Sequence, residues 1–224
     1  MRKNVFMVLD TETADATGNV YDIGYVICDR HGNTFAEYNA AVREVFTDPA
    51  RMMGAYYAKK TFSHYVPMFD AGSLRLVPWL DIVGQIRADI AEHNVTAVTA
   101  YNATFDFRAL RNTHGQLGHA SRILPAGLRT LDLWLFACET IFRQRTYHKL
   151  ADRLGWLTDA GNVRTTAEHA FRYVSGEFDF CEDHTALSDA RIERDILVRL
   201  LAQRKRIPWG KLIGSPWRIA QNAA

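Results

Sequence analysis

A short apolar run near the start of the chain, from Asn4 to Leu9, ends in the triplet Asp10-Thr11-Glu12. A run that is apolar at consecutive positions is typical of a β-strand buried on both faces, because a half-buried strand alternates apolar and polar residues. The run therefore predicts an α/β fold with a covered sheet. It also predicts two carboxylates on one face at the end of a buried strand, where each must be paired or bound to a metal.

The rest of the pattern favours a single domain with strands first and helices later. The β-prone segments 20–28 and 34–42 flank a turn with Gly32 and Asn33, which predicts a hairpin. Further strands are expected at 96–101 and 129–132. Helices are expected at 48–60, 78–93, 104–114, 133–144, 146–154, 165–175 and 185–203, with a looser stretch at 61–77. We therefore expect a mixed five-stranded sheet flanked by helices over residues 1–203.

Composition bounds the class of protein and its compartment. A chain of 224 residues with 48% hydrophobic and 23% charged residues is neither disordered nor collagen-like. Its cysteines, Cys28, Cys138 and Cys181, are scattered and form no C-x-x-C pair, which predicts a reducing, cytoplasmic location. The apolar run at the N-terminus is too short for a signal peptide, and no stretch is long enough to span a membrane.

Charge is unevenly divided along the chain. Six basic and no acidic side chains follow residue 198, which leaves 21 basic and 25 acidic side chains before it. We therefore treat residues 204–224 as a basic tail. With its tryptophans Trp209 and Trp217, the tail is expected to contact phosphate or a protein partner in replication or repair, although a solubilising extension explains the composition equally well.

A second acidic site is predicted where Asn102 and Asp106 follow the strand at 96–101. On the helix that begins there, Asp106 shares an inward stripe with Ala109, Leu110 and Thr113. A carboxylate on an inward face needs a partner. The alternative is an aspartate that only stabilises the first turn through the helix dipole.

The third cluster is His184 and Asp189, in the run HTALSDA. Asp189 lies on the inward stripe with Ile192, Ile196 and Leu200, so this carboxylate also points toward the core. It lies five positions after the histidine, which is not the spacing of one helical face. His184 is therefore expected before the helix or in its first turn, outside the core.

The order of these clusters, D-x-E, then N-x-x-F-D, then H-x-x-x-x-D, resembles the three motifs of the DEDDh family of 3′-to-5′ exonucleases, which have a ribonuclease H-like fold. DIGYV at 22–26, TLDLWLFA at 130–137 and YHKLADRLG at 147–155 are also similar to segments of that family. The resemblance covers most of residues 4–200.

The resemblance implies a role for each matching residue. Asp10, Glu12, Asp106 and Asp189 would be the ligands of two metal ions, and His184 would be the general base. Thr11, Thr13, Asn102 and Phe105 would contact the substrate. Four carboxylates without a cysteine favour Mg²⁺, with Mn²⁺ able to substitute, over zinc. The implied partner is nucleic acid with a free 3′ end.

Three readings of function stay open at this point. The first is an exonuclease that releases nucleoside 5′-monophosphates from single-stranded DNA. The second is an exoribonuclease or oligoribonuclease of the same fold, since recognition of the 2′-hydroxyl depends on pocket shape. The third is a non-catalytic module that binds nucleic acid or protein.

The segment 43–78 has no counterpart in the resemblance. Its aromatic and basic side chains include Tyr56, Tyr57, Lys59, Lys60, Phe62, His64 and Tyr65. These side chains form either a surface that stacks on bases and contacts phosphates or part of the core.

Overall fold

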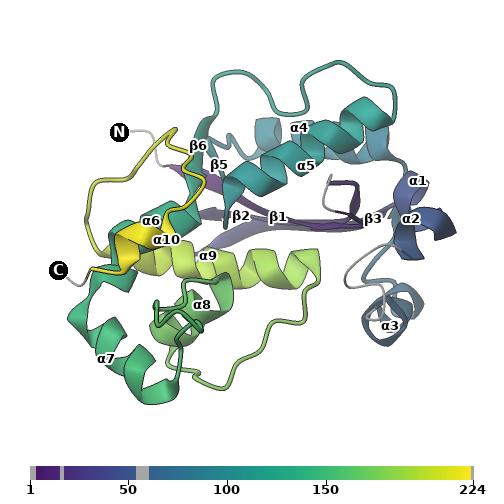
Figure 1. The fold of residues 1–224 in the computed structure, drawn as a ribbon. Coiled ribbons are helices and arrows are strands. Elements are labelled where there is room, and N and C mark those ends of the chain that lie inside the picture. The colour runs from purple at the N-terminus through teal and green to yellow at the C-terminus, as the bar shows by residue number, and fades with distance from the viewer. Residues whose placement is uncertain (1–3, 16–17, 54–60, 223–224) are drawn as a thin grey trace.

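The structure is a computed structural model that describes residues 4–15, 18–53 and 61–222. A six-stranded mixed sheet runs through its centre with helices on both faces (Figure 1). The strand order is β4-β3-β2-β1-β5-β6. The strands are β1 Val5–Thr13, β2 Val20–Asp29, β3 Thr34–Val42, β4 Leu76–Val77, β5 Ala97–Ala100 and β6 Arg129–Asp132. The predicted α/β fold with a mixed, helix-covered sheet is confirmed, and the sheet has one strand more than expected.

The central strand β1 sets the geometry of the sheet. It pairs with β2 in antiparallel register and with β5 in parallel register, and β5 continues parallel to β6. β2 and β3 form the predicted hairpin, with Gly32 at a positive φ of 85° in its turn. Because β1, β5 and β6 run in the same direction, the residues that follow their carboxyl ends meet at one end of the sheet.

Helices cover the two faces of the sheet (Figure 1). One face packs on α4 Trp79–Glu92 and α5 Ala103–Gln116. The other packs on α6 Leu133–Glu139 and α9 Ala186–Ala202, with α7 Arg145–Leu154, α8 Ala167–Ser175 and α10 Trp217–Ala220 further out. Met7 and Leu9 of β1 pack in the core between the sheet and helices α4 and α5. Phe6 and Val8 pack in the core on the opposite face, and none of the four side chains has exposed surface. The apolar run is thus buried on both faces, as predicted.

The segment between β3 and α4 differs from the prediction. It contains α1 Arg43–Phe46, α2 Pro49–Met53, a π-helical turn at Thr61–Tyr65 and α3 Val66–Asp70, so the stretch expected to be loose is partly helical. Pro67 lies in the first turn of α3, where its missing N–H is not needed. Tyr65 is a core residue. Tyr56, Tyr57, Lys59, Lys60 and the side chain of Phe62 lie outside the described residues.

The three cysteines are free, with Cys28 and Cys138 buried and Cys181 exposed. The predicted helix at 133–144 is divided into α6 and a 3₁₀ turn at Ile141–Arg143. Across the described ranges, none of the helices combines the length and the apolar character needed to cross a bilayer.

Candidate metal and catalytic centre

Asp10 and Glu12 lie on one face of β1 near its carboxyl end. The strand pairing places Asp10 opposite Gly24 and Glu12 opposite Asp22 on β2. Glu12 is 8% exposed, and Asp10 is half-buried. The central strand therefore ends in two carboxylates beside the core, as the sequence predicts.

The residue between them reaches the other face of the sheet and holds Asp106. The Thr11 backbone N–H donates to Asp106 Oδ1 at 3.1 Å, and the Thr11 hydroxyl donates to the same oxygen at 2.8 Å. Asp106 is 2% exposed in the first turn of α5, on the predicted inward stripe. Just before α5, Asn102 adopts a left-handed conformation with φ 64° and ψ 50°, which allows the chain to turn sharply from β5 into the helix.

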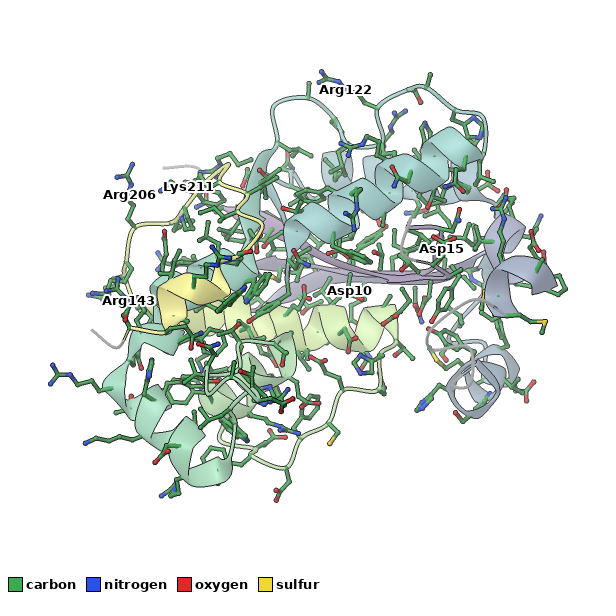
Figure 2. All side chains as sticks on the ribbon, in the orientation of Figure 1. Asp10, Asp15, Arg122, Arg143, Arg206 and Lys211 are labelled. Atoms are coloured by element: carbon green, nitrogen blue, oxygen red, sulfur yellow. The ribbon has the colours of Figure 1, made fainter. Side chains whose placement is uncertain are left out.

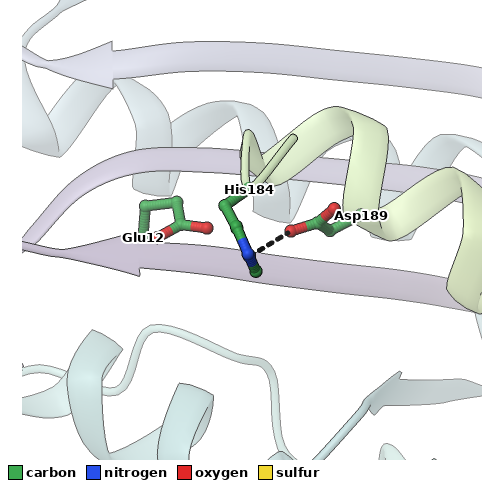
Figure 3. A group of neighbouring side chains, drawn as sticks. All are labelled: Glu12, His184 and Asp189. Atoms are coloured by element: carbon green, nitrogen blue, oxygen red, sulfur yellow. Dashed lines mark ion pairs between the residues drawn. The ribbon is translucent and has the colours of Figure 1, made fainter. Parts of the chain in front are cut away.

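The third segment brings His184 and Asp189 to the same place. Asp189 lies in the first turn of α9 and is 8% exposed. His184 precedes the helix with a positive φ of 56°, and its Nδ1 lies 4.0 Å from Asp189 Oδ2. Ligand atoms of Glu12, His184 and Asp189 all lie within 4.8 Å of one another, and Figure 3 shows the imidazole between the two carboxylates.

The electrostatics of the cluster favour a cation. Burial and the charges of Asp106 and Glu12 raise the pKa of Asp10 well above its usual value. Burial raises the pKa of Asp106 to about 7 despite the hydrogen bonds from Thr11. Burial and the charge of Asp10 raise the pKa of Asp189 to about 10. These shifts express the cost of desolvating acids that repel one another, and a divalent cation among them removes that cost.

A buried aspartate on β2 anchors the start of α9. Asp22 has no exposed surface, and its Oδ2 accepts hydrogen bonds from the Ala186 N–H at 3.0 Å and the Tyr65 hydroxyl at 2.8 Å. Two residues along β2, Gly24 lies directly under the helix. A Cβ at that position would lie 2.2 Å from the Leu187 nitrogen. The absence of a side chain at Gly24 therefore lets α9, with Asp189, approach β1 and β2 closely.

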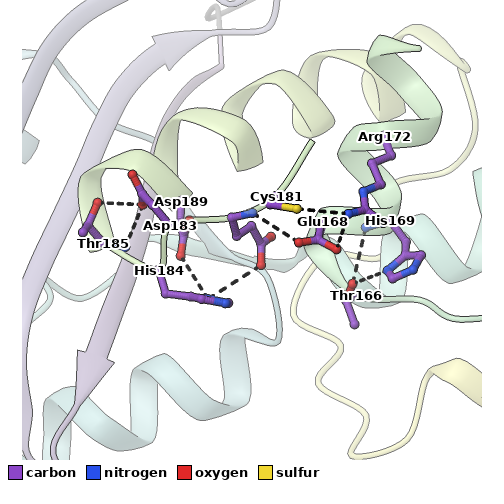
Figure 4. Close-up of polar contacts among 10 residues, drawn as sticks. Thr166, Glu168, His169, Arg172, Cys181, Asp183, His184, Thr185 and Asp189 are labelled. Atoms are coloured by element: carbon purple, nitrogen blue, oxygen red, sulfur yellow. Dashed lines mark hydrogen bonds and ion pairs between the residues drawn. The ribbon is translucent and has the colours of Figure 1, made fainter. Parts of the chain in front are cut away.

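The loop that carries the histidine is tied to α8 (Figure 4). The Glu182 N–H donates to Glu168 Oε2 at 3.2 Å, and the guanidinium of Arg172 lies 3.0 Å from Glu168 Oε1. Directly before α9, Asp183 Oδ1 accepts from the N–H and the hydroxyl of Thr185 at 3.0 and 2.9 Å. These contacts fix the backbone on both sides of the histidine.

Two acids near the cluster are absent from the sequence prediction. Glu182 Oε2 lies 3.8 Å from the imidazole Nδ1 of His184, on the same loop. Glu193 lies one turn after Asp189 on α9, is 2% exposed, and accepts a hydrogen bond from the Tyr101 N–H at 3.0 Å. Burial and the charges of the site aspartates raise its pKa well above the usual value. Its spacing of four residues from Asp189 places it on the same inward stripe, and that spacing is the signal that could have identified it.

The residues expected to contact substrate lie around the cluster. Thr13 is the last residue of β1, and Phe105 is half-buried in the first turn of α5 with the Arg108 guanidinium carbon 5.4 Å from its ring centroid. Asn102 lies between β5 and α5. Thr11 is 5% exposed and its hydroxyl is engaged by Asp106. All four adjoin the acidic residues, and their role toward a substrate stays a prediction.

Comparisons with known proteins identify solved structures with a similar fold, but no matching protein family or curated sequence. A structure of exonuclease X in complex with 5′-overhanging duplex DNA is 15% identical and aligns over 96% of this chain and 99% of that one, with a TM-score of 0.49. A full-length 3′-exonuclease is 9% identical, with a TM-score of 0.62 over 96% of this chain and 66% of that one. This chain therefore spans about two thirds of the length of the second structure and shares its α/β fold.

Proposed function

We propose that this chain is a metal-dependent 3′-to-5′ exonuclease of the DEDDh type that hydrolyses single-stranded DNA to nucleoside 5′-monophosphates. The observation that carries the proposal is the convergence of carboxylates from three distant segments beside one histidine. Residues 1–203 form the catalytic domain and residues 204–224 a basic tail. The scattered free cysteines support a cytoplasmic location.

The acids of the cluster suit two hard cations. Asp10, Glu12, Asp106 and Asp189 offer only oxygen ligands, which favours Mg²⁺ or Mn²⁺. Their raised pKa values fit a site that requires positive charge to ionise fully. When bound, a pair of ions activates a water molecule and stabilises the charge that develops on the leaving 3′ oxygen.

The chain's own residues orient the reactants and move the proton. Thr11 fixes the carboxylate of Asp106 through two hydrogen bonds, so that this ligand keeps one orientation. His184 takes the proton from the attacking water as general base. Its Nδ1 faces Glu182 and Asp189, and their negative charge stabilises the imidazolium that forms. Thr13, Asn102 and Phe105 contact the terminal nucleotide.

Digestion of matched DNA and RNA strands, labelled at the 3′ or the 5′ end, with Mg²⁺ tests the proposal. We expect immediate release of labelled mononucleotide from 3′-labelled DNA and gradual shortening of 5′-labelled DNA. Faster cleavage of RNA would identify the exoribonuclease alternative. No cleavage of either strand with Mg²⁺ or Mn²⁺ would reject nuclease activity and favour a binding module.

A further inference from the structure

The C-terminal tail docks on the body at the end of the sheet opposite the acidic cluster. The Trp209 ring stacks on Phe6 near the beginning of β1, with centroids 6.2 Å apart and planes at 10°. The Arg129 guanidinium carbon lies 4.2 Å from the same ring, and the Gly210 N–H donates to the Thr130 carbonyl at 2.9 Å. The tail therefore has a fixed position, across the starts of β1 and β6.

This arrangement changes what the tryptophans of the tail can do. The ring of Trp209 is half-buried, lies between Phe6 and Arg129, and anchors the tail instead of offering a free stacking face. Further along, the Ala220 carbonyl accepts from His148 at 2.9 Å and α10 packs in the same core as α6. Binding around Trp209 must therefore rely on the cations of the tail.

The docked tail gathers cations around two adjoining hollows. One hollow, of about 610 Å³, is lined by Lys205, Arg206 and Lys211, and the other, of about 420 Å³, by Arg30, Arg204 and Lys205. We call these five exposed residues the basic surface. In Figure 2, Arg206 extends outward at the left of the molecule with Lys211 near it, and Asp10 lies toward the centre.

The basic surface carries charge that the described chain does not neutralise. No carboxylate among the described residues lies within salt-bridge distance of any of its five cations. Glu139 is the acidic residue in the lining of the two hollows. An anionic partner is thus the ligand that this surface fits.

We propose that the basic surface binds the phosphate backbone of a nucleic acid strand, 5′ of the nucleotide held at the acidic cluster. The position of the 3′ end rests on the proposed function. A protein partner is less suited, because Trp209, the aromatic side chain in the lining of the larger hollow, is already engaged by Phe6 and Arg129. From Asn4, directly before β1, to Asp10, the extended chain spans about 20 Å, which corresponds to about six stacked nucleotides at about 3.4 Å each.

Fluorescence anisotropy of the full chain in EDTA, where no cleavage occurs, tests this proposal. The variant Lys205→Gln/Arg206→Gln/Lys211→Gln removes three cations of the basic surface. The variant Arg145→Gln/Lys149→Gln/Arg153→Gln removes three exposed cations of α7 and is the matched control. The probes are single DNA strands of about 20 and about 4 nucleotides, the shorter being unable to span the distance above.

For the longer strand, the tail variant is expected to bind on the order of a hundredfold more weakly at 0.1 M salt, with a salt slope shallower by about 2. The control is expected to bind both strands as the wild type does, and the short strand, which contacts fewer cations, should lose less affinity in the tail variant than the long strand does. Equal affinity and slope for wild type and tail variant, or an equal loss in the control, would overturn the proposal. Because metal is absent, the outcome is independent of the nuclease test.

Discussion

Replacing Gly24 with alanine is expected to damage activity far more than a change of one methyl group suggests. The new Cβ would lie 2.2 Å from the Leu187 nitrogen, 2.4 Å from its Cα and 2.5 Å from the Ala186 carbonyl carbon. Carbon atoms pack at about 3.5–4.0 Å, so the start of α9 must retreat by more than about 1 Å. Because Gly24 lies opposite Asp10, that retreat separates Asp189 from Asp10.

The displacement of α9 is expected to lower both the rate of cleavage and the stability of the protein. A misplacement of about 1 Å in a catalytic constellation costs about a hundredfold in rate. Overpacking costs about 1–3 kcal/mol of stability, which for a domain of this size lowers Tm by about 2–12 °C. Turnover of a 3′-labelled strand and a thermal melt, both on Gly24→Ala, measure the two effects.

Gly84→Ala is the matched control for this prediction. Gly84 lies in α4, where a Cβ would meet no atom within 4 Å. The change should leave turnover as it is and stabilise the protein by about 0.5–1 kcal/mol, because alanine loses less backbone entropy in a helix. Wild-type turnover and Tm in Gly24→Ala would refute the argument from close packing.

Three further predictions concern the acidic cluster. Asp189→Asn should abolish cleavage while Tm in EDTA stays level or rises, because asparagine is neutral without the cost of keeping a buried acid protonated beside Asp10; a lower Tm would mean that Asp189 stabilises the fold. His184→Ala should lose roughly a hundredfold or more in kcat and still bind Mn²⁺ in a calorimetric titration, whereas loss of Mn²⁺ binding would make the histidine a ligand. In EDTA, the free energy of unfolding should fall as pH rises from about 4 toward 7. Burial raises the pKa values of Asp22 and Asp106 to about 6 and about 7, so both hold protons in the folded state that the unfolded chain has released. Urea unfolding at each pH measures this dependence, and excess Mg²⁺ should flatten it.

Much of the fold follows from local pattern. The apolar run of β1, the hairpin turn around Gly32 and the stripes of α5 and α9 each depend on residues close together in sequence, and each is found where it was expected. The strand β4 could not be predicted in this way. It has two residues, too few for any periodicity, and exists because Leu76 and Val77 pair with the end of β3.

The candidate site also has features that local sequence patterns predict and features that they do not. Asp10, Glu12, Asp106 and Asp189 could be proposed because each follows a strand or shares a stripe with core residues. The contact between Gly24 and Leu187 could not, because it joins residues far apart in sequence through backbone atoms. The docking of the tail could not be predicted either, because Trp209 contacts Phe6 and Arg129, which are far from it in sequence. The composition of the tail predicted its positive charge but not its position.

Counting the Mn²⁺ ions bound by the wild type and by Asp10→Asn tests the central claim most directly. Titration followed by electron paramagnetic resonance, with a nucleoside 5′-monophosphate present, reports stoichiometry without requiring turnover. We expect two ions per chain in the wild type, and fewer, more weakly held ions in the variant, because Asp10 lies at the centre of the charge repulsion in the cluster. No binding to the wild type at millimolar Mn²⁺, or equal binding to both proteins, would contradict the assignment of these acids as a metal centre.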